Sequence, residues 1–164
     1  MKNRVVVTGM GLVSPIGDSI EDFWKNLKSG KNGINEITHF DTDKFDVKIA
    51  GQSQIQLDNY FDKKELNKLD RFSTFAIIAA DQAIKQSRII SDNVLKERIG
   101  VIVGSGIGGI STFEKQHSKL LKNPRFVSPF FIPSMISDIA PGHVSIKYGF
   151  TGINYSVVSA CATS

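Results

Sequence analysis

Short runs of β-branched residues that end at glycine or another small residue constrain the fold of this chain more than any other feature. Residues 4–8 and residues 99–103 each run into a glycine, a pattern typical of buried strands. A third run, residues 154–158, leads toward the single cysteine, Cys161. The segments between these runs have helical spacing, and helices that alternate with buried strands predict a layered α/β fold.

The first predicted helix carries its own start and stop signals. Ser19 and Asp22 form a capping pair, and apolar residues follow at helical spacing from Ile20 until Gly30 stops the helix. Trp24 lies on the apolar face of this helix, so we expect it to anchor the helix in the core.

Three longer helical segments follow a loop-rich stretch at residues 31–62, in which only residues 47–51 predict an edge strand. The first of the three has an apolar side with several alanines, which indicates tight packing of that helix. Pro141 and Gly142 are expected to kink or end the last one. The predicted ranges are 63–87, 110–122 and 134–148.

The composition excludes several classes of function. One cysteine permits no internal disulfide bond, and no apolar run approaches the roughly 20 residues of a membrane span. The net charge of +4 comes from scattered lysines without a zinc-finger or RNA-binding pattern, so we expect no nucleic-acid partner. His39, His117 and His143 lie far apart, and we assign neither a metal nor a cofactor. A reducing cytoplasm is the expected location.

A glycine motif after the second strand matches the dinucleotide-binding fingerprint but fails its second requirement. Gly104, Gly106 and Gly109 have the spacing that lets a backbone approach a pyrophosphate. The ribose-binding acid should lie roughly 20 residues further on. After Glu114, however, the next carboxylate is Asp138. We therefore expect these glycines to permit close backbone approach beside a pocket instead.

Cys161 lies where a strand leads into a turn of small residues, the position in which a protein presents a nucleophile. A helix beginning there would lower the pKa of the thiol and offer backbone N–H groups to an oxyanion. The alternative is that Cys161 is a small buried hydrophobe, as most free cysteines are. The apolar segment at residues 126–133 contains too much proline for a central strand, and we expect it to line a site.

Six blocks in this order resemble one family, the β-ketoacyl-[acyl-carrier-protein] synthases, and within it the elongating enzymes. The resemblance implies a thiolase-like layered αβαβα fold, of which this chain is part of the N-terminal half. Residues 1–164 would be the N-terminal β-ketoacyl synthase domain, truncated just after the nucleophile, from a protein about two to three times longer. The blocks are Arg4–Gly17, His39–Thr42, Gly104–Gly109, Ser128–Pro133, Gly142–His143 and Ser159–Ser164.

The resemblance also implies roles for individual residues. Cys161 matches the acyl-accepting nucleophile, and its own backbone N–H would be one oxyanion donor. Ile107 matches a residue that lines the acyl pocket, and Phe130 and Phe131 belong to the aromatic segment beside it, with core or dimer packing as the alternative. Lys64 and Lys68 fall in a basic segment that resembles the carrier-protein docking patch, with a solvated helix face as the alternative.

The implied reaction is the decarboxylative Claisen condensation of an acyl chain held on Cys161 with malonyl-acyl carrier protein. The implied partners are acyl carrier protein, acyl and malonyl thioesters, and a second copy of the full-length protein. In the family, two histidines and a lysine from the C-terminal half assist decarboxylation, so we expect the fragment alone to be inactive.

Two alternatives stay open: a non-catalytic condensing-enzyme-like subunit or acyl-binding module, and a polyketide-type ketosynthase. The chain also departs from the usual family pattern in having Pro141 before Gly142 and Ile153 after a glycine.

Overall fold

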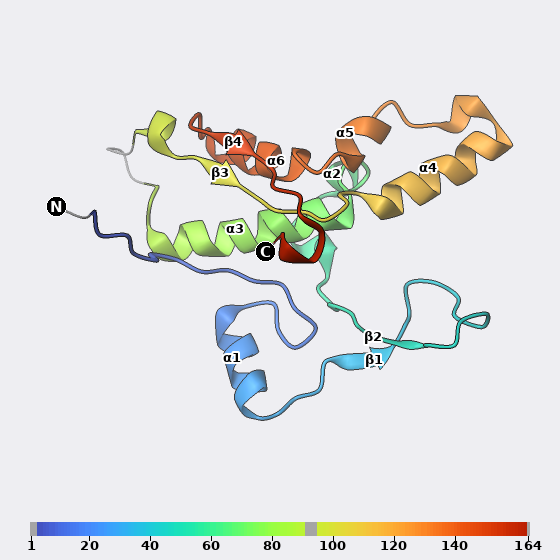
Figure 1. Cartoon of the computed structure of the whole chain (residues 1–164), viewed down its shortest axis with the longest axis horizontal. Coiled ribbons are helices and arrows are strands. Elements are labelled where there is room, and N and C mark those ends of the chain that lie inside the picture. The colour runs from blue at the N-terminus through green and yellow to red at the C-terminus, as the bar shows by residue number, and fades with distance from the viewer. Residues whose placement is uncertain (1–2, 91–94, 164) are drawn as a thin grey trace.

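The computed structural model describes residues 3–90 and 95–163, in which helices and short strands alternate (Figure 1). The helices of this part are α1 (Ile20–Lys28), α2 (Lys63–Leu66), α3 (Arg71–Ser87), α4 (Ile110–Lys122), α5 (Phe131–Met135) and α6 (Ile139–Tyr148). The strands are β1 (Ile34–Glu36), β2 (Ile49–Gly51), β3 (Val101–Ile102) and β4 (Asn154–Tyr155). Single turns of 3-10 helix lie at Leu57–Asn59, Lys96–Arg98, Pro124–Phe126 and Ala160–Ala162.

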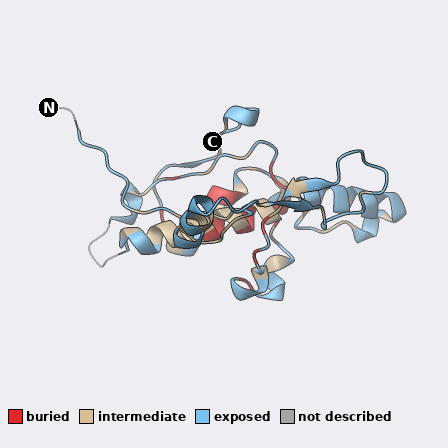
Figure 2. Ribbon diagram, turned by 90° about the horizontal axis from the view of Figure 1, so that it is seen from below, coloured by how far each residue is buried: buried red, intermediate tan, exposed pale blue. Residues whose placement is uncertain are grey.

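Helix α3 is the centre of the molecule. It packs against α6, which in turn contacts both strands of the parallel β3–β4 pair, and Figure 1 shows the N-terminal segment and α1 on the other side of α3. Buried residues gather in the middle of the molecule, as Figure 2 shows. The predicted layered α/β class is confirmed. The core side chains are Ile55, Phe61, Ile77, Ile78, Val101, Val144 and Phe150.

The N-terminal segment is extended but is not the buried strand that its valines predict. Val5 is 91% exposed, and no strand partner pairs with residues 4–8 within the described ranges. The chain runs along α3, where the amide oxygens of Gln86 and Gln82 accept hydrogen bonds from the backbone N–H groups of Met10 and Leu12. Side-chain amides thus take the place of a neighbouring strand, and they leave the valine side chains uncovered.

The alanines of α3 fulfil the prediction of tight packing. A Cβ atom on Gly9 would lie 2.1 Å from the carbonyl oxygen of Ala83, and one on Gly11 would lie 2.0 Å from that of Ala79. Only glycine allows the N-terminal segment to approach the helix this closely.

Helix α1 starts as predicted, because the Ser19 side chain accepts a hydrogen bond from the N–H of Asp22. The prediction that Trp24 anchors the core is wrong. Trp24 is 56% exposed, and the ammonium group of Lys28 lies 5.5 Å from its ring. An amphipathic pattern identifies the apolar face of a helix but not whether another element covers that face.

Two helices are interrupted at places other than those predicted. The expected helix at 63–87 divides into α2 and α3 because Asp70 caps a new helix after a break. Helix α5 ends at Met135 and α6 begins at Ile139, so the break in the segment 134–148 precedes Pro141. Pro141 lies in the first turn of α6, where a backbone N–H would have no acceptor within the helix. The N–H that proline lacks therefore costs the helix no hydrogen bond.

The remaining local predictions are confirmed in part. Helix α4 has the predicted bounds, Ile110–Lys122. The predicted edge strand at 47–51 contains β2, but it pairs with β1, a strand that the sequence did not indicate. The second buried strand, predicted at 99–103, is shorter, and β3 covers Val101–Ile102.

Candidate functional site

Cys161 lies in a strained turn at the end of the described chain. Ala160, immediately before it, has φ 51°, a left-handed conformation that costs a non-glycine residue about 1–2 kcal/mol. The Thr163 hydroxyl holds this turn, because it donates to the carbonyl of Ala160 at 2.7 Å and accepts from the N–H of Ser159 at 2.9 Å. Strain of this kind is found most often at active sites and ligand clamps.

The thiol of Cys161 is accessible. The residue is exposed, which contradicts the alternative that it is a small buried hydrophobe. Its backbone N–H forms no hydrogen bond to any residue in the described part of the chain. The turn therefore presents a nucleophilic sulfur together with a free backbone donor, the two groups that an acyl-transfer site needs.

The glycine-rich loop at residues 104–109 lies directly against this turn. A Cβ atom on Gly104 would lie 2.7 Å from the carbonyl oxygen of Thr163, and the N–H of Ser105 donates to the carbonyl of Val157 at 3.2 Å. Gly106 is less restricted, since the carbonyl oxygen of Ala160 lies 3.9 Å from its Cβ position, an ordinary contact. The predicted close approach is confirmed at Gly104 and at Gly109, whose Cβ position lies 2.6 Å from the carbonyl oxygen of Ser134.

The same loop forms one wall of an apolar hollow of about 530 Å³. At the loop, Gly108 has φ 83° and the N–H of Gly109 donates to the carbonyl of Met135 at 2.7 Å, so α5 forms the opposite wall. Asp138 lies at the rim. The lining residues are Ile107, Ile110, Phe113, Met135, Ile136, Ser137 and Asp138. The hollow has the apolar character that an acyl chain requires.

Phe130 and Phe131 do not line the hollow that contains Ile107. They line a second hollow of about 620 Å³ between α2, α4 and α5. Phe113 connects the two places, because it lines the first hollow and its ring centroid lies 6.2 Å from that of Phe131. The structure therefore places Ile107 on the loop whose residues Gly104 and Ser105 contact the segment around Cys161, and it places the two phenylalanines in a separate hollow.

Lys64 and Lys68 are both exposed, and Lys68 lines a third hollow of about 340 Å³. Lys64 is within α2, which Asp62 and Glu65 stabilise by a reciprocal capping box. Lys68 follows α2, and its ammonium group lies 5.2 Å from the ring of Phe130. Of the two lysines, Lys68 thus contacts the aromatic segment.

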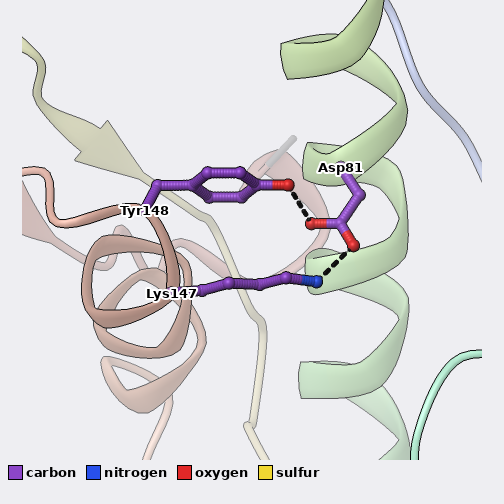
Figure 3. Close-up of polar contacts among 3 residues, drawn as sticks. All are labelled: Asp81, Lys147 and Tyr148. Atoms are coloured by element: carbon purple, nitrogen blue, oxygen red, sulfur yellow. Dashed lines mark hydrogen bonds and ion pairs between the residues drawn. The ribbon is translucent and has the colours of Figure 1, made fainter. Parts of the chain in front are cut away.

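The sequence analysis missed a cluster that joins α3 to α6. The Asp81 carboxylate accepts hydrogen bonds from the Lys147 ammonium group and, at 2.6 Å, from the Tyr148 hydroxyl, as Figure 3 shows. Burial, followed by the hydrogen bond and the charge of Asp81, raises the pKa of Tyr148 well above its usual value. Burial also lowers the pKa of His143. No local pattern in either helix indicated that these three side chains meet, because α6 carries one lysine and α3 has Asp81 within a mostly apolar run.

Asp70 is a second residue that the sequence analysis missed. Its position before an apolar helical run indicates a helix cap, but nothing local indicates that it is buried or that it contacts α4.

In the described ranges, no cluster of three or more histidine, cysteine or acidic side chains has the arrangement of a metal site. None of the described helices is both long and apolar enough to cross a membrane.

Residues 2–164 match the sequence model of the family described as "Beta-ketoacyl synthase, N-terminal domain". The chain is 48% identical over 163 residues to a 3-oxoacyl-[acyl-carrier-protein] synthase 2 of Staphylococcus aureus, covering 98% of this chain and 39% of the relative. It is 43% identical to the protein of the same name from Vibrio cholerae, covering 99% and 40%. The chain thus spans about two fifths of the length of these relatives.

Solved ketosynthases have the same fold as this chain. The ishigamide ketosynthase/chain length factor matches with a TM-score of 0.86 at 24% identity, covering 99% of this chain and 41% of that one. A β-ketoacyl synthase from Burkholderia phymatum matches with a TM-score of 0.79 at 21% identity, with the same two coverages. A type II polyketide ketosynthase, in complex with its acyl-carrier protein and bound to the hexaketide, matches with a TM-score of 0.68 at 25% identity, covering 92% and 41%.

Proposed function

The chain belongs to the β-ketoacyl synthase family, and on that premise we propose that the whole protein is a condensing acyltransferase of fatty-acid biosynthesis. Residues 1–164 are the N-terminal domain portion that carries the nucleophile. The reaction is the decarboxylative Claisen condensation of an acyl thioester on Cys161 with malonyl-acyl carrier protein. The fold, which is that of the N-terminal portion of thiolase-like ketosynthases, is consistent with this role.

The observation that carries the proposal is the exposed thiol of Cys161 in a left-handed turn beside the loop of Ile107. An acyl group on the sulfur needs an apolar space close by, and the hollow next to this loop supplies it. Ile107 is the pocket residue in this arrangement. Phe131 acts on the pocket through Phe113, and Phe130 is its neighbour in the aromatic segment.

The acyl-transfer step follows from the groups in the turn. The Cys161 thiol loses its proton, and its sulfur forms a bond to the carbonyl carbon of the donor thioester while the carrier's thiolate leaves and takes up a proton. Negative charge develops on the carbonyl oxygen in this step. The free N–H of Cys161 donates to that oxyanion.

Condensation passes through a second oxyanion at the same place. Loss of carbon dioxide from the malonyl group makes an enolate, whose carbon attacks the Cys161 thioester and releases the sulfur. The N–H that served the first step serves this one too, because the same carbonyl carbon becomes tetrahedral again. In the family, two histidines and a lysine from further along the chain assist the decarboxylation.

Acyl carrier protein is the proposed macromolecular partner, and it docks on Lys64 and Lys68. Carrier proteins present phosphate and carboxylate groups, which exposed ammonium groups attract. The polyketide ketosynthase that shares this fold was solved with its acyl-carrier protein. We place the full-length protein in the cytoplasm as a homodimer, as expected for the family.

A polyketide role is the second candidate, favoured by the likeness to a type II polyketide ketosynthase. The proteins named 3-oxoacyl-[acyl-carrier-protein] synthase 2 are far more similar, at 43–48% identity against 25% for the polyketide ketosynthase, so fatty-acid synthesis is preferred. The exposed and retained Cys161 argues against a non-catalytic subunit.

Intact mass spectrometry of the full-length protein tests the proposal. After incubation with an acyl-carrier-protein thioester, the wild type should gain one acyl mass, which peptide mapping should place on Cys161. The variant Cys161→Ala should gain none, and Ser156→Ala, a small change in the preceding segment, should load like the wild type. An acyl group on any other residue, or an acylated Cys161→Ala variant, would refute the assignment of the nucleophile.

A further inference from the structure

Asp70 is a buried carboxylate that the proposed chemistry does not use. It is 6% exposed, and no cation pairs with it among the residues described. One oxygen accepts the N–H of Phe72 at 3.3 Å and so caps α3. The other accepts both the N–H of Thr112 at 2.8 Å and its hydroxyl at 2.7 Å. One side chain therefore joins the beginnings of two helices, α3 and α4.

Helix α4 depends on this contact because it has no cap of its own. Its N-cap residue is Gly109, which has no side chain to accept a hydrogen bond from the first turn. A side chain there would not fit, since a Cβ atom would lie 3.0 Å from the Asp70 oxygen and 2.6 Å from the carbonyl oxygen of Ser134. Asp70 supplies the missing acceptor from another part of the chain, and its negative charge suits the positive end of the helix dipole.

The segment that contains Asp70 also holds the opposite wall of the Ile107 hollow. Two residues earlier, the carbonyl of Lys68 accepts a hydrogen bond from the Ser134 hydroxyl at 2.6 Å, which fixes α5 beside Met135. Asp70 fixes the wall that carries Ile107, through Thr112. Three consecutive residues, 68–70, thus hold both walls, in addition to the direct hydrogen bond from the N–H of Gly109 to the carbonyl of Met135.

We propose that Asp70 is a positioning residue that sets the shape of the Ile107 hollow and thereby the acyl chain lengths that Cys161 accepts. The inference rests on the proposed function. Asp70 does not contact the acyl chain. It acts through Thr112, whose neighbours Ile110 and Phe113 line the hollow.

The substitution Asp70→Asn tests this with little change in shape. Asparagine has one acceptor oxygen, so it can cap α3 or accept from Thr112 but not both. The measurement is kcat/KM of the full-length protein with acyl-carrier donors of increasing chain length. Each methylene of the acyl chain that the hollow fails to bury lowers kcat/KM about fourfold. If the variant buries two fewer methylenes of a long chain, the ratio of long-chain to short-chain kcat/KM falls about fifteenfold.

Asp81→Asn is the matched control, because it makes the same change on the same helix at a carboxylate that holds α6 instead of α4. It should lower Tm while the chain-length ratio stays at the wild-type value. Thr112→Ser keeps both donors to Asp70 and should also retain the ratio.

Three outcomes overturn the inference. The first is that Asp70→Asn lowers kcat/KM by one common factor at every chain length, and the second is that Asp81→Asn changes the ratio equally. If Asp70→Asn does not fold, the variant Thr112→Val, which removes only the hydroxyl contact, takes its place and should lower the ratio of long-chain to short-chain kcat/KM. An unchanged ratio in Thr112→Val is the third outcome that overturns the inference. A wild type that loads no acyl chain at all would instead refute the proposed function and this inference with it.

Discussion

The contact between Gly104 and the Cys161 turn leads to a sharp prediction about the substitution Gly104→Ala. The new methyl group would lie 2.7 Å from the backbone oxygen of Thr163, whereas ordinary contacts begin at 3.4 Å. The turn or the loop must therefore move by about 0.7 Å. A misplacement of 1 Å in a reacting group can cost about a hundredfold in rate, so we expect acyl loading of Cys161 to slow at least about tenfold.

Gly106→Ala is the matched control within the same loop. The nearest heavy atom outside the local chain lies 3.9 Å from its Cβ position, which is an ordinary contact. The assay is the time course of acyl loading in the full-length protein, followed by intact mass spectrometry. If both variants load at the wild-type rate, the close approach of the loop does not position Cys161, and the reasoning is wrong.

Three further predictions concern the core, the α3–α6 cluster and the docking surface. Ile78 is only 1% exposed, so Ile78→Ala should lower the free energy of unfolding by about 2–5 kcal/mol, measured by denaturant titration. The raised pKa of Tyr148 means that the folded state holds the phenolic proton more tightly than the unfolded state. The difference in free energy of unfolding between the wild type and Tyr148→Phe should therefore have its full value below pH 10.0 and shrink above it. Denaturant titrations below and above this pH measure that difference. Lys64→Glu combined with Lys68→Glu should raise KM for carrier-bound donors at least about tenfold and spare small thioester donors in steady-state kinetics.

Two of these predictions have a control of the same chemistry, and the Tyr148 prediction has a result that would contradict it. Ile146 is 79% exposed, and Ile146→Ala should change stability by no more than about 0.5 kcal/mol. A difference between wild type and Tyr148→Phe that does not vary with pH would show that burial and the Asp81 contact do not raise the pKa of Tyr148. Lys25→Glu combined with Lys28→Glu makes the same charge change on α1. If this pair raises KM equally, the docking surface is not specific to α2.

Much of the local structure followed from the sequence because its signals lie within a few residues. Ser19 predicted the start of α1, and the predicted range 110–122 matches α4, which ends before Asn123 and Pro124, since caps and helix breakers act on the adjacent turn. The glycines at 104–109 were correctly expected to permit close approach, and the motif around Cys161 was enough to identify its exposed turn.

The errors concern features that depend on distant parts of the chain. Trp24 and the valines of residues 5–7 are apolar and regularly spaced, yet nothing in the described structure covers them. Pro141 was expected to break a helix but instead occupies the first turn of α6, because the preceding residues had already ended α5. The aromatic segment was expected beside Ile107, but the packing of α4 against α5 directs Phe130 and Phe131 into a different hollow.

The sequence by itself determined the start of α1 and both ends of α4, the close approach of the glycine-rich loop, and the thiol presented on a turn of small residues. These depend on backbone conformation and on neighbours along the chain. The tertiary structure alone decided which apolar faces are covered, that Asp70 caps two helices, and that residues 68–70 hold both walls of the hollow. These properties depend on groups that meet in space after folding, and the hydrogen bonds that create them join residues as far apart as Lys68 and Ser134.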